Sequence, residues 1–324
     1  MAGPVRRLLR DPVGAVVVAL AAAVLLGIAA PALFGTYYVE VGFRLLLLIV
    51  LAEAWNLLAG YGGLVSLGSS SFFGLGCYVT VGMLNHVAAG LPLALLAAAL
   101  AGTVMAVVVS PAIFRLRGLY FTVGTLALAE ALRLFVVNVP WFGGASGLFI
   151  AVDLPDVEAL FRYGVVMVGI AAIVMTVCTR SRFSIMLRAV RDDEDAAGQM
   201  GVRGFRVKRA AFAVASALMA AVGGLQAVRL GTIEPYGSFG LQWSVDALTM
   251  VVIGGIGRRF GAIVGAVFVV VLGELLANYP ELHIAITGLI LILVIRFAPR
   301  GLSGVISDGL AWLSARPARG EIAR

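Results

Sequence analysis

The sequence has 324 residues, of which 61% are hydrophobic and only 13% are charged. One soluble core could not enclose so many apolar side chains, so the composition excludes a soluble globular domain and indicates a polytopic membrane protein. The net charge is +7, but the basic residues gather between apolar runs, as membrane topology requires, and we expect no nucleic-acid partner.

Apolar segments recur along the whole chain and predict an all-α protein with about ten transmembrane helices in a single domain, residues 1–324. The predicted spans other than the third cover residues 13–34, 41–58, 91–114, 119–139, 165–179, 210–230, 244–256, 262–278 and 284–295. Residues from about 140–163 and 231–243 are expected to be external loops. With ten crossings, twenty of the 24 Lys and Arg residues fall on one side, so the positive-inside bias predicts that both termini are cytoplasmic.

The third apolar segment, within residues 56–84, is interrupted by repeated glycines and serines. Such irregular backbone is tolerated at membrane depth only where protein or a water-filled cavity surrounds it. We therefore predict a broken span, with Gly68, Ser69 and Ser70 as candidates for the lining of a translocation path.

Charged side chains inside the predicted spans form a second group of candidates. An acid at the centre of a transmembrane helix costs on the order of 2 to 3 kcal/mol, so it should face protein or water. Glu53 and Asn56 are three residues apart on one helix face, and they are candidates for the path together with Asp246, for which the membrane interface is an equal alternative. Glu130 and Arg133 have the spacing of a structural ion pair.

The longest polar segment, residues 180–209, holds eight of the 24 basic residues and four of the 17 acids. It predicts two short helices: the first starts at Ser181 or Ser184, and the second has Asp192 at its N-terminus, in a capping box with Asp195. Small residues on the second helix leave a thin exposed face that suits docking into a groove on another protein. The alternative is a basic loop that only sets the topology. The candidate docking residues are Arg188, Arg191, Asp195, Ala196, Ala197 and Gly201, the last in the position of a helix C-terminal glycine.

No catalytic or metal-binding motif is present in the sequence. The sole lysine, Lys208, lies in RVKRA without the preceding glycine that a nucleotide-binding P-loop requires. We therefore predict no enzyme activity, no metal and no cofactor on this chain. If ATP powers the protein, another subunit must bind the nucleotide.

Several segments, in order, resemble the signature blocks of the branched-chain amino acid ABC transporter permeases, specifically the M-type (LivM) family. They are GYGGLVSLGSSSFFGLGCYVTV, RLRGLYFTVGTLALAEALRL, SRFSIMLRAVRDDEDAAGQMGV, VVIGGIGRRFGAIVGAVF and FAPRGL. The resemblance covers about residues 57–302, and DAAGQMG resembles the EAA motif of importer permeases, with Asp195 in the place of the Glu. One departure is that Ser69 stands where this family usually has His.

The resemblance implies a type II-like importer permease in the bacterial inner membrane. The implied partners are a second homologous permease, two cytoplasmic ATPase subunits that hold ATP and Mg, and a periplasmic substrate-binding protein. The implied cargo is leucine, isoleucine and valine, or a related amino acid, an amide or urea. Two other classes stay open: an ion-coupled secondary transporter that uses Glu53, Asp246 or Glu274, and a receptor-like or structural membrane protein without transport activity.

Overall fold

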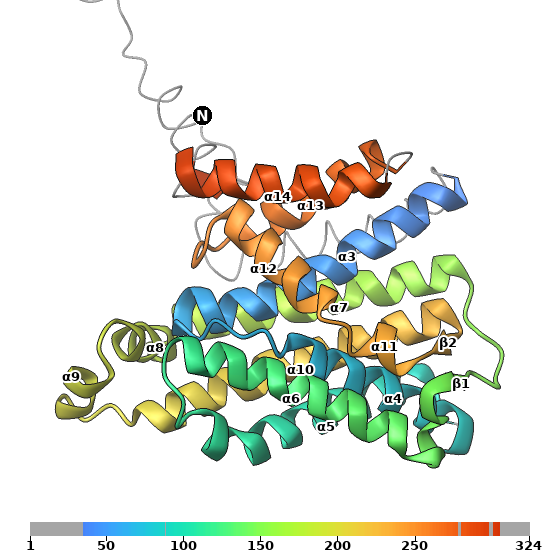
Figure 1. Ribbon diagram of the computed structural model, residues 1–324, viewed down its shortest axis with the longest axis horizontal. Helices are drawn as coiled ribbons and strands as arrows, with labels where there is room; N and C mark the ends of the chain where they lie inside the picture. Colours follow the sequence, from blue (N-terminus) through green and yellow to red (C-terminus); the bar gives the residue numbers. More distant parts are fainter. Residues whose placement is uncertain (1–34, 88, 278–279, 298–300, 305–324) are drawn as a thin grey trace, which may run out of the picture.

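The computed structural model describes residues 35–87, 89–277, 280–297 and 301–304. Within these ranges the protein is a bundle of helices with one two-stranded antiparallel pair, β1 (Leu148–Phe149) and β2 (Thr232–Ile233), in which Leu148 pairs with Ile233 (Figure 1). The apolar segment predicted at residues 13–34 lies outside the described residues.

The helices follow the order of the apolar segments. They are α3 (Thr36–Asn56), α4 (Ser69–Val87), α5 (Leu91–Ile113), α6 (Leu119–Asn138), α7 (Val157–Arg180), α8 (Arg182–Asp192), α9 (Glu194–Gln199), α10 (Gly204–Leu230), α11 (Pro235–Ser238), α12 (Gln242–Gly254), α13 (Gly261–Leu275) and α14 (Pro280–Phe297). The last turn of α3 widens into a π-helix, η1 (Leu57–Tyr61), and two short 3-10 turns, η2 (Pro140–Phe142) and η3 (Gly144–Ser146), follow α6.

Five helices in the described ranges are long and apolar enough to cross a membrane: α3 with η1, α5, α6, α7 and α10. Each has about twenty residues or more, which is the length that a bilayer core of about 30 Å requires. By contrast, α12 and α13 have 13 and 15 residues, and α4 combines 19 residues with three serines at its start. The all-helical membrane class is confirmed, and the five long helices coincide with five of the predicted spans.

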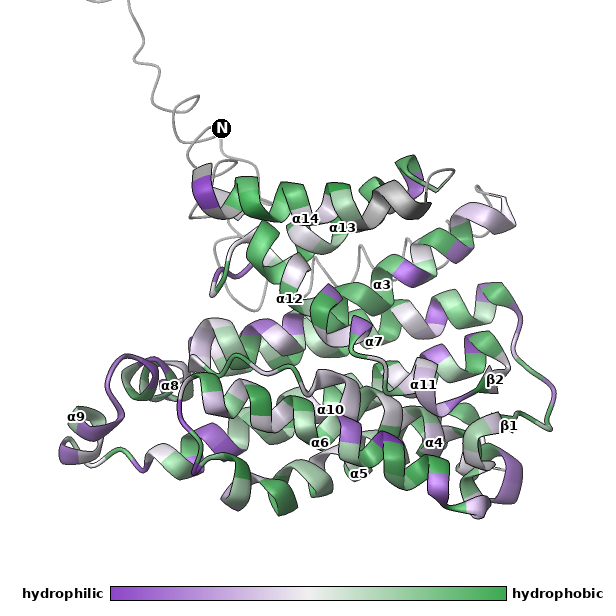
Figure 2. Ribbon diagram, in the orientation of Figure 1, coloured by the Kyte–Doolittle hydropathy of each residue, from purple (hydrophilic) through white to green (hydrophobic). Residues whose placement is uncertain are grey.

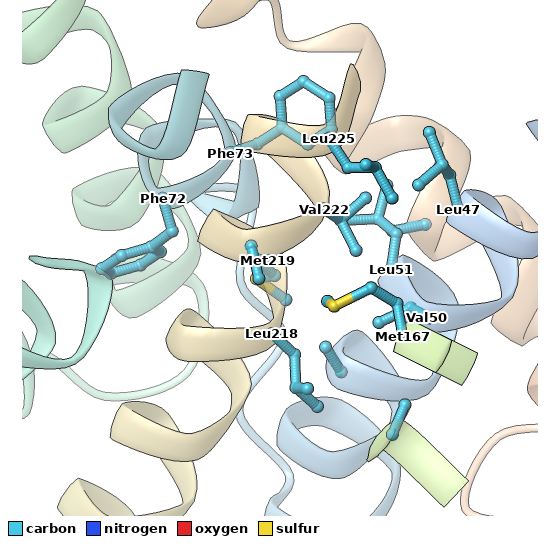
Figure 3. Close-up of a cluster of buried hydrophobic side chains, with 14 of the residues drawn as sticks. Leu47, Val50, Leu51, Phe72, Phe73, Met167, Leu218, Met219, Val222 and Leu225 are labelled. Atoms are coloured by element: carbon cyan, nitrogen blue, oxygen red, sulfur yellow. The ribbon is translucent and has the colours of Figure 1, made fainter. Parts of the chain in front are cut away.

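Helix α10 forms the centre of the bundle and packs against α4 and α5. A Cβ atom at Gly76 of α4 would lie 1.8 Å from the carbonyl oxygen of Ala220 of α10, so the two backbones touch where no side chain fits. Figure 3 shows a buried apolar cluster to which α10 contributes. Its labelled residues are Leu47, Val50 and Leu51 of α3, Phe72 and Phe73 of α4, Met167 of α7, and Leu218, Met219, Val222 and Leu225 of α10.

The stretch between η1 and α4, residues 63–68, is not helical, although it lies against α3 and α6. Its backbone is paired by side chains: Trp55 Nε1 donates to the carbonyl oxygen of Ser66 at 2.8 Å, and Thr122 Oγ1 donates to that of Val65 at 2.8 Å. The Leu67 N–H donates to Thr125 Oγ1 at 3.1 Å. Non-helical backbone among membrane helices needs such partners, which explains why the predicted third span is broken here.

The two ends of the molecule differ in character. Figure 1 shows α8 and α9 at one end and β1 with β2 at the opposite end. The chain passes from one end to the other along α7 and returns along α10. The polar segment predicted at residues 180–209 is therefore a compact projection and not an extended loop.

Candidate functional site

The projection consists of two consecutive helices with well-defined ends. Helix α8 begins directly after Ser181, as predicted, and α9 begins after Asp193, whose Oδ1 accepts the N–H groups of Asp195 at 3.0 Å and Ala196 at 2.9 Å. The prediction of Asp192 as the capping residue is wrong by one position, because Asp192 still belongs to α8 and the extended backbone starts at Asp193. Gly201 has φ +85°, as its predicted place after a helix end requires.

The exposed face of α9 differs from the predicted one. Ala197 is only 6% exposed and faces the inside of the projection, where α9 packs on α8 and α10. The expectation that Ala197 lies on an exposed face is wrong, because α9 packs this side against α8 and α10. Asp195 and Ala196 are exposed, and Met200 presents a thioether side chain that is 85% exposed.

An ion pair ties α9 to the body of the protein. Lys208 Nζ of α10 lies 2.7 Å from Glu194 Oε1 at the start of α9, and the Lys208 side chain is 11% exposed. The same ammonium lies 5.5 Å from the centre of the Phe114 ring at the end of α5. The sequence analysis considered Lys208 only as a phosphate ligand and missed this structural role. The presence of an acid, Glu194, near the sole lysine was the signal that could have indicated an ion pair.

Helix α8 contacts the π-helical turn η1. Arg191 Nη1 donates to the carbonyl oxygen of Gly60 at 2.8 Å, and the fully buried side chain of Leu187 packs on Gly62. Arg188 instead bonds within its own helix, with Nη2 donating to Ser184 Oγ at 2.7 Å. Of the two predicted arginines, Arg191 therefore makes the contact between the projection and a long helix.

A third element reaches η1 from the loop between α12 and α13, residues 255–260. Asn56 is fully buried; its Nδ2 donates to the carbonyl oxygen of Arg258 at 3.1 Å, and its Oδ1 accepts the N–H of Gly257 at 2.8 Å. A Cβ at Gly60 would lie 2.5 Å from the nitrogen of Gly257, so the backbones meet directly. We call the contact of residues 56–63 with α8 and with this loop the η1 junction. π-Helical turns occur frequently at functional sites.

Glu53 lies one turn before the junction, and the cavity that it lines does not include Ser69 or Ser70. It lines a cavity of about 290 Å³ between α3, α7 and α13, together with Thr176 and Arg259. Arg259 Nη2 donates to Thr176 Oγ1 at 3.4 Å in this cavity. The structure therefore does not bring Glu53 together with the serines predicted for the path.

The start of α4 lies deep in the bundle. Ser69, Ser70 and Ser71 are buried, and their hydroxyl groups have no hydrogen-bond partner within the described part of the chain. The N–H of Ser70 donates to Ser244 Oγ of α12 at 3.0 Å, and Gly68 lies against the backbone of Thr125 of α6. This brings α4, α6 and α12 together at the end of the non-helical stretch.

One face of α6 is exposed along the whole helix and carries a charged pair near its middle. Arg133 Nε donates to Glu130 Oε2 at 2.9 Å, a second bond joins Arg133 Nη2 to Glu130 Oε1, and the predicted ion pair is formed. The Glu130 side chain is 53% exposed and that of Arg133 18%. Figure 2 shows a hydrophilic stretch midway along this otherwise mainly hydrophobic helix.

Helix α11 contacts α6 and places an aromatic residue against the charged pair. The Arg133 guanidinium lies 4.5 Å from the centre of the ring of Tyr236, an exposed residue of α11. At the start of α12, Gln242 Nε2 donates to Asp246 Oδ1 at 2.6 Å. Asp246 is half-buried, so it lies at the edge of the bundle and not in its interior.

Comparison with known proteins identifies a protein family and several relatives that the chain resembles. The family described as "Branched-chain amino acid transport system / permease component" matches residues 37–295. The permease LivM of Salmonella typhimurium is 28% identical over 93% of this chain and 78% of its own length, and the permease LivH of the same organism is 29% identical over 52% of this chain and 53% of its own. The autoinducer 2 import permease LsrC of Escherichia coli is 28% identical over 59% of this chain and 58% of its own. No solved structure matches the chain.

Proposed function

The chain belongs to the family of branched-chain amino acid transport system permease components, and from this we propose that it is the M-type permease subunit of an ATP-driven importer. Its role is transport and not catalysis, since the relatives are transport permeases. In this proposal it lies in the bacterial inner membrane with about ten spans and a type II-like fold, and both termini are cytoplasmic.

The observation that carries the proposal is the projection formed by α8 and α9. Its outer side exposes Asp195, Ala196 and Met200, whereas its inner side contacts α7, α10 and η1. Such a rigid, outward-facing unit suits docking to a cytoplasmic ATPase subunit that binds ATP and Mg. A loop that only sets topology would not need these internal contacts.

The contacts define how force would pass from the projection into the bundle. A displacement of α9 would act on α10 through Glu194 and Lys208, and a displacement of α8 would act on η1 through Arg191 and Gly60. From η1 the movement would reach the α12–α13 loop through Asn56. Closely packed elements transmit such shifts as discrete rearrangements, as alternating access requires.

The exposed face of α6 is the proposed site of the translocation path and of the second permease. An ion pair half-exposed midway along a transmembrane helix is unfavourable in lipid, so we expect water or a neighbouring subunit to cover it. The non-helical stretch before α4 adjoins the inner side of α6, and it leads to the serine hydroxyls that have no hydrogen-bond partner among the described residues. The naming of LivM and LivH as separate permeases supports a heterodimeric pair.

The proposed cargo is a branched-chain amino acid, from the resemblance to LivM. Because LsrC is named for autoinducer 2, the wider family includes importers of other small molecules. The test is to purify the chain with the partners that copurify, including the periplasmic binding protein, and to reconstitute the complex in liposomes. We expect uptake of leucine that requires ATP and the binding protein, and no uptake of urea. Uptake without ATP that collapses with an ionophore would instead identify a secondary transporter.

A further inference from the structure

The Glu130–Arg133 pair has features that a purely structural ion pair does not need. Glu130 is preceded by eleven residues of α6, which at 1.5 Å per residue places it roughly 16 Å from the start of a helix of 20 residues. Its carboxylate is half-exposed in this chain, although both oxygens accept bonds from Arg133. Because each ionised carboxylate oxygen can accept more than one hydrogen bond, Glu130 can bind a further donor on its open side.

The surroundings of the pair combine fixed charge with apolar surface. Tyr236 covers one face of the Arg133 guanidinium and holds the pair in place from α11. One helical turn after Glu130, Leu134 presents an exposed side chain on the same face, next to exposed Phe135. A molecule that approaches this part of α6 therefore meets an anion, a cation and aliphatic and aromatic carbon within a short distance.

We propose that Glu130 and Arg133 bind the zwitterionic head group of an α-amino acid as it crosses the membrane. The ammonium group donates to the open side of Glu130, the carboxylate accepts from Arg133, and the apolar side chain packs on Leu134 and Phe135. This inference rests on the proposed transport function and deepens it, since it assigns the recognition of the cargo to named residues. The proposed binding of cargo also explains why a charged pair lies midway along a transmembrane helix, where an exposed ion pair is energetically unfavourable.

A double-mutant comparison separates cargo binding from a structural role. If the pair only locks the fold, Glu130→Gln or Arg133→Gln alone leaves an unpaired charge, and the combined E130Q/R133Q variant relieves this and recovers function. If the pair binds cargo, each single change removes one contact, and the double variant loses both. The two roles therefore predict opposite outcomes for the double variant.

The experiment measures initial leucine uptake by the reconstituted complex together with its thermal stability. We expect each single variant to reduce uptake about ten-fold or more, as the loss of a charge-assisted hydrogen bond implies, and the double variant to be at least as impaired while its complex remains assembled. The matched control is Glu158→Gln in the exposed Glu158–Arg162 pair of α7, which should leave uptake unchanged.

The outcomes distinguish this inference from the proposed function. Absence of ATP-dependent leucine uptake by the wild-type complex would refute the function. Wild-type uptake that is retained by both single variants, or restored in E130Q/R133Q, would overturn the cargo site alone. If a single variant fails to assemble, the double variant decides, because its two neutral amides can still bond to each other.

Discussion

Replacing Arg191 by alanine should uncouple ATP hydrolysis from transport. The change removes the bond from Nη1 to the carbonyl oxygen of Gly60, which is the polar contact between α8 and η1. A hydrogen bond from a charged donor contributes about 1.5 to 3 kcal/mol, and since 36% of the Arg191 side chain is exposed, the lower part of this range applies. The additional pairing of Arg191 with exposed Asp192 adds little, as is usual for surface ion pairs.

A loss of about 1.5 kcal/mol corresponds to a roughly ten-fold weaker link between α8 and η1. The assay is to reconstitute the complex in liposomes and to measure the leucine taken up per ATP hydrolysed. We expect Arg191→Ala to hydrolyse ATP with clearly reduced uptake per ATP, whereas Arg206→Ala, at an exposed position of α10, should keep the wild-type ratio. An unchanged ratio in Arg191→Ala would refute the role of the η1 junction in coupling.

Three further substitutions test other contacts. Asn56→Ala should destabilise the protein by about 1 to 3 kcal/mol, because it removes the two hydrogen bonds that the fully buried Asn56 amide makes to the backbone of Gly257 and Arg258; a lowered melting temperature in detergent checks this, and unaltered melting contradicts it. Ala197→Trp should loosen α9, since Ala197 is buried, and faster proteolysis between α8 and α10 is the expected result, whereas wild-type resistance would show that the site tolerates bulk. Ser70→Ala removes a hydroxyl that has no partner in the described residues, so stability should be retained, and a fall in leucine uptake would report a contact with cargo; equal uptake would place Ser70 outside the path.

Hydropathy predicted the long helices well because each of them must satisfy its own backbone in an apolar environment. The starts of α3, α7 and α10 were placed too late, and α7 shows why. Residues from Val157 were read as loop because they are interspersed with charges, yet Glu158 and Arg162 are four residues apart and pair along the helix surface at 3.6 Å. Charge density alone therefore gave the wrong boundary at this end of the molecule.

The details of the polar segment were predictable only where a residue type determines the backbone. Gly201 was identified because few other residues adopt a positive φ. Four consecutive acids, by contrast, are all suitable for capping, and the choice of Asp193 depends on where the backbone becomes extended. The burial of Ala197 depends on α8 and α10, which no local pattern around α9 describes.

The η1 junction could not be predicted, because its partners are far apart in the sequence. Asn56 and Gly257 are 201 positions apart, and Arg191 and Gly60 are 131 apart. The sequence showed an Asn at membrane depth and a third apolar segment interrupted by glycines, and both were interpreted as signs of a path. The structure uses them to bring two backbones into contact.

The arrangement around η1 has a consequence for transport. The η1 junction receives Arg191 from α8 and the α12–α13 loop through Asn56. It leads directly into the non-helical stretch that ends at the serines of α4, whose hydroxyl groups have no hydrogen-bond partner in the described part of the chain. We expect η1 to transmit movement between these parts, since π-helical turns within helices are frequent at functional sites. A shift of α8 would then move residues 63–68 relative to Thr122 and Thr125 of α6, the helix that carries Glu130 and Arg133. The segment from η1 to the start of α4 would thus connect the residues that contact α8 with the residues proposed for the path of the cargo. A rigid α-helical connection between α3 and α4 would not link these two groups of residues in this way.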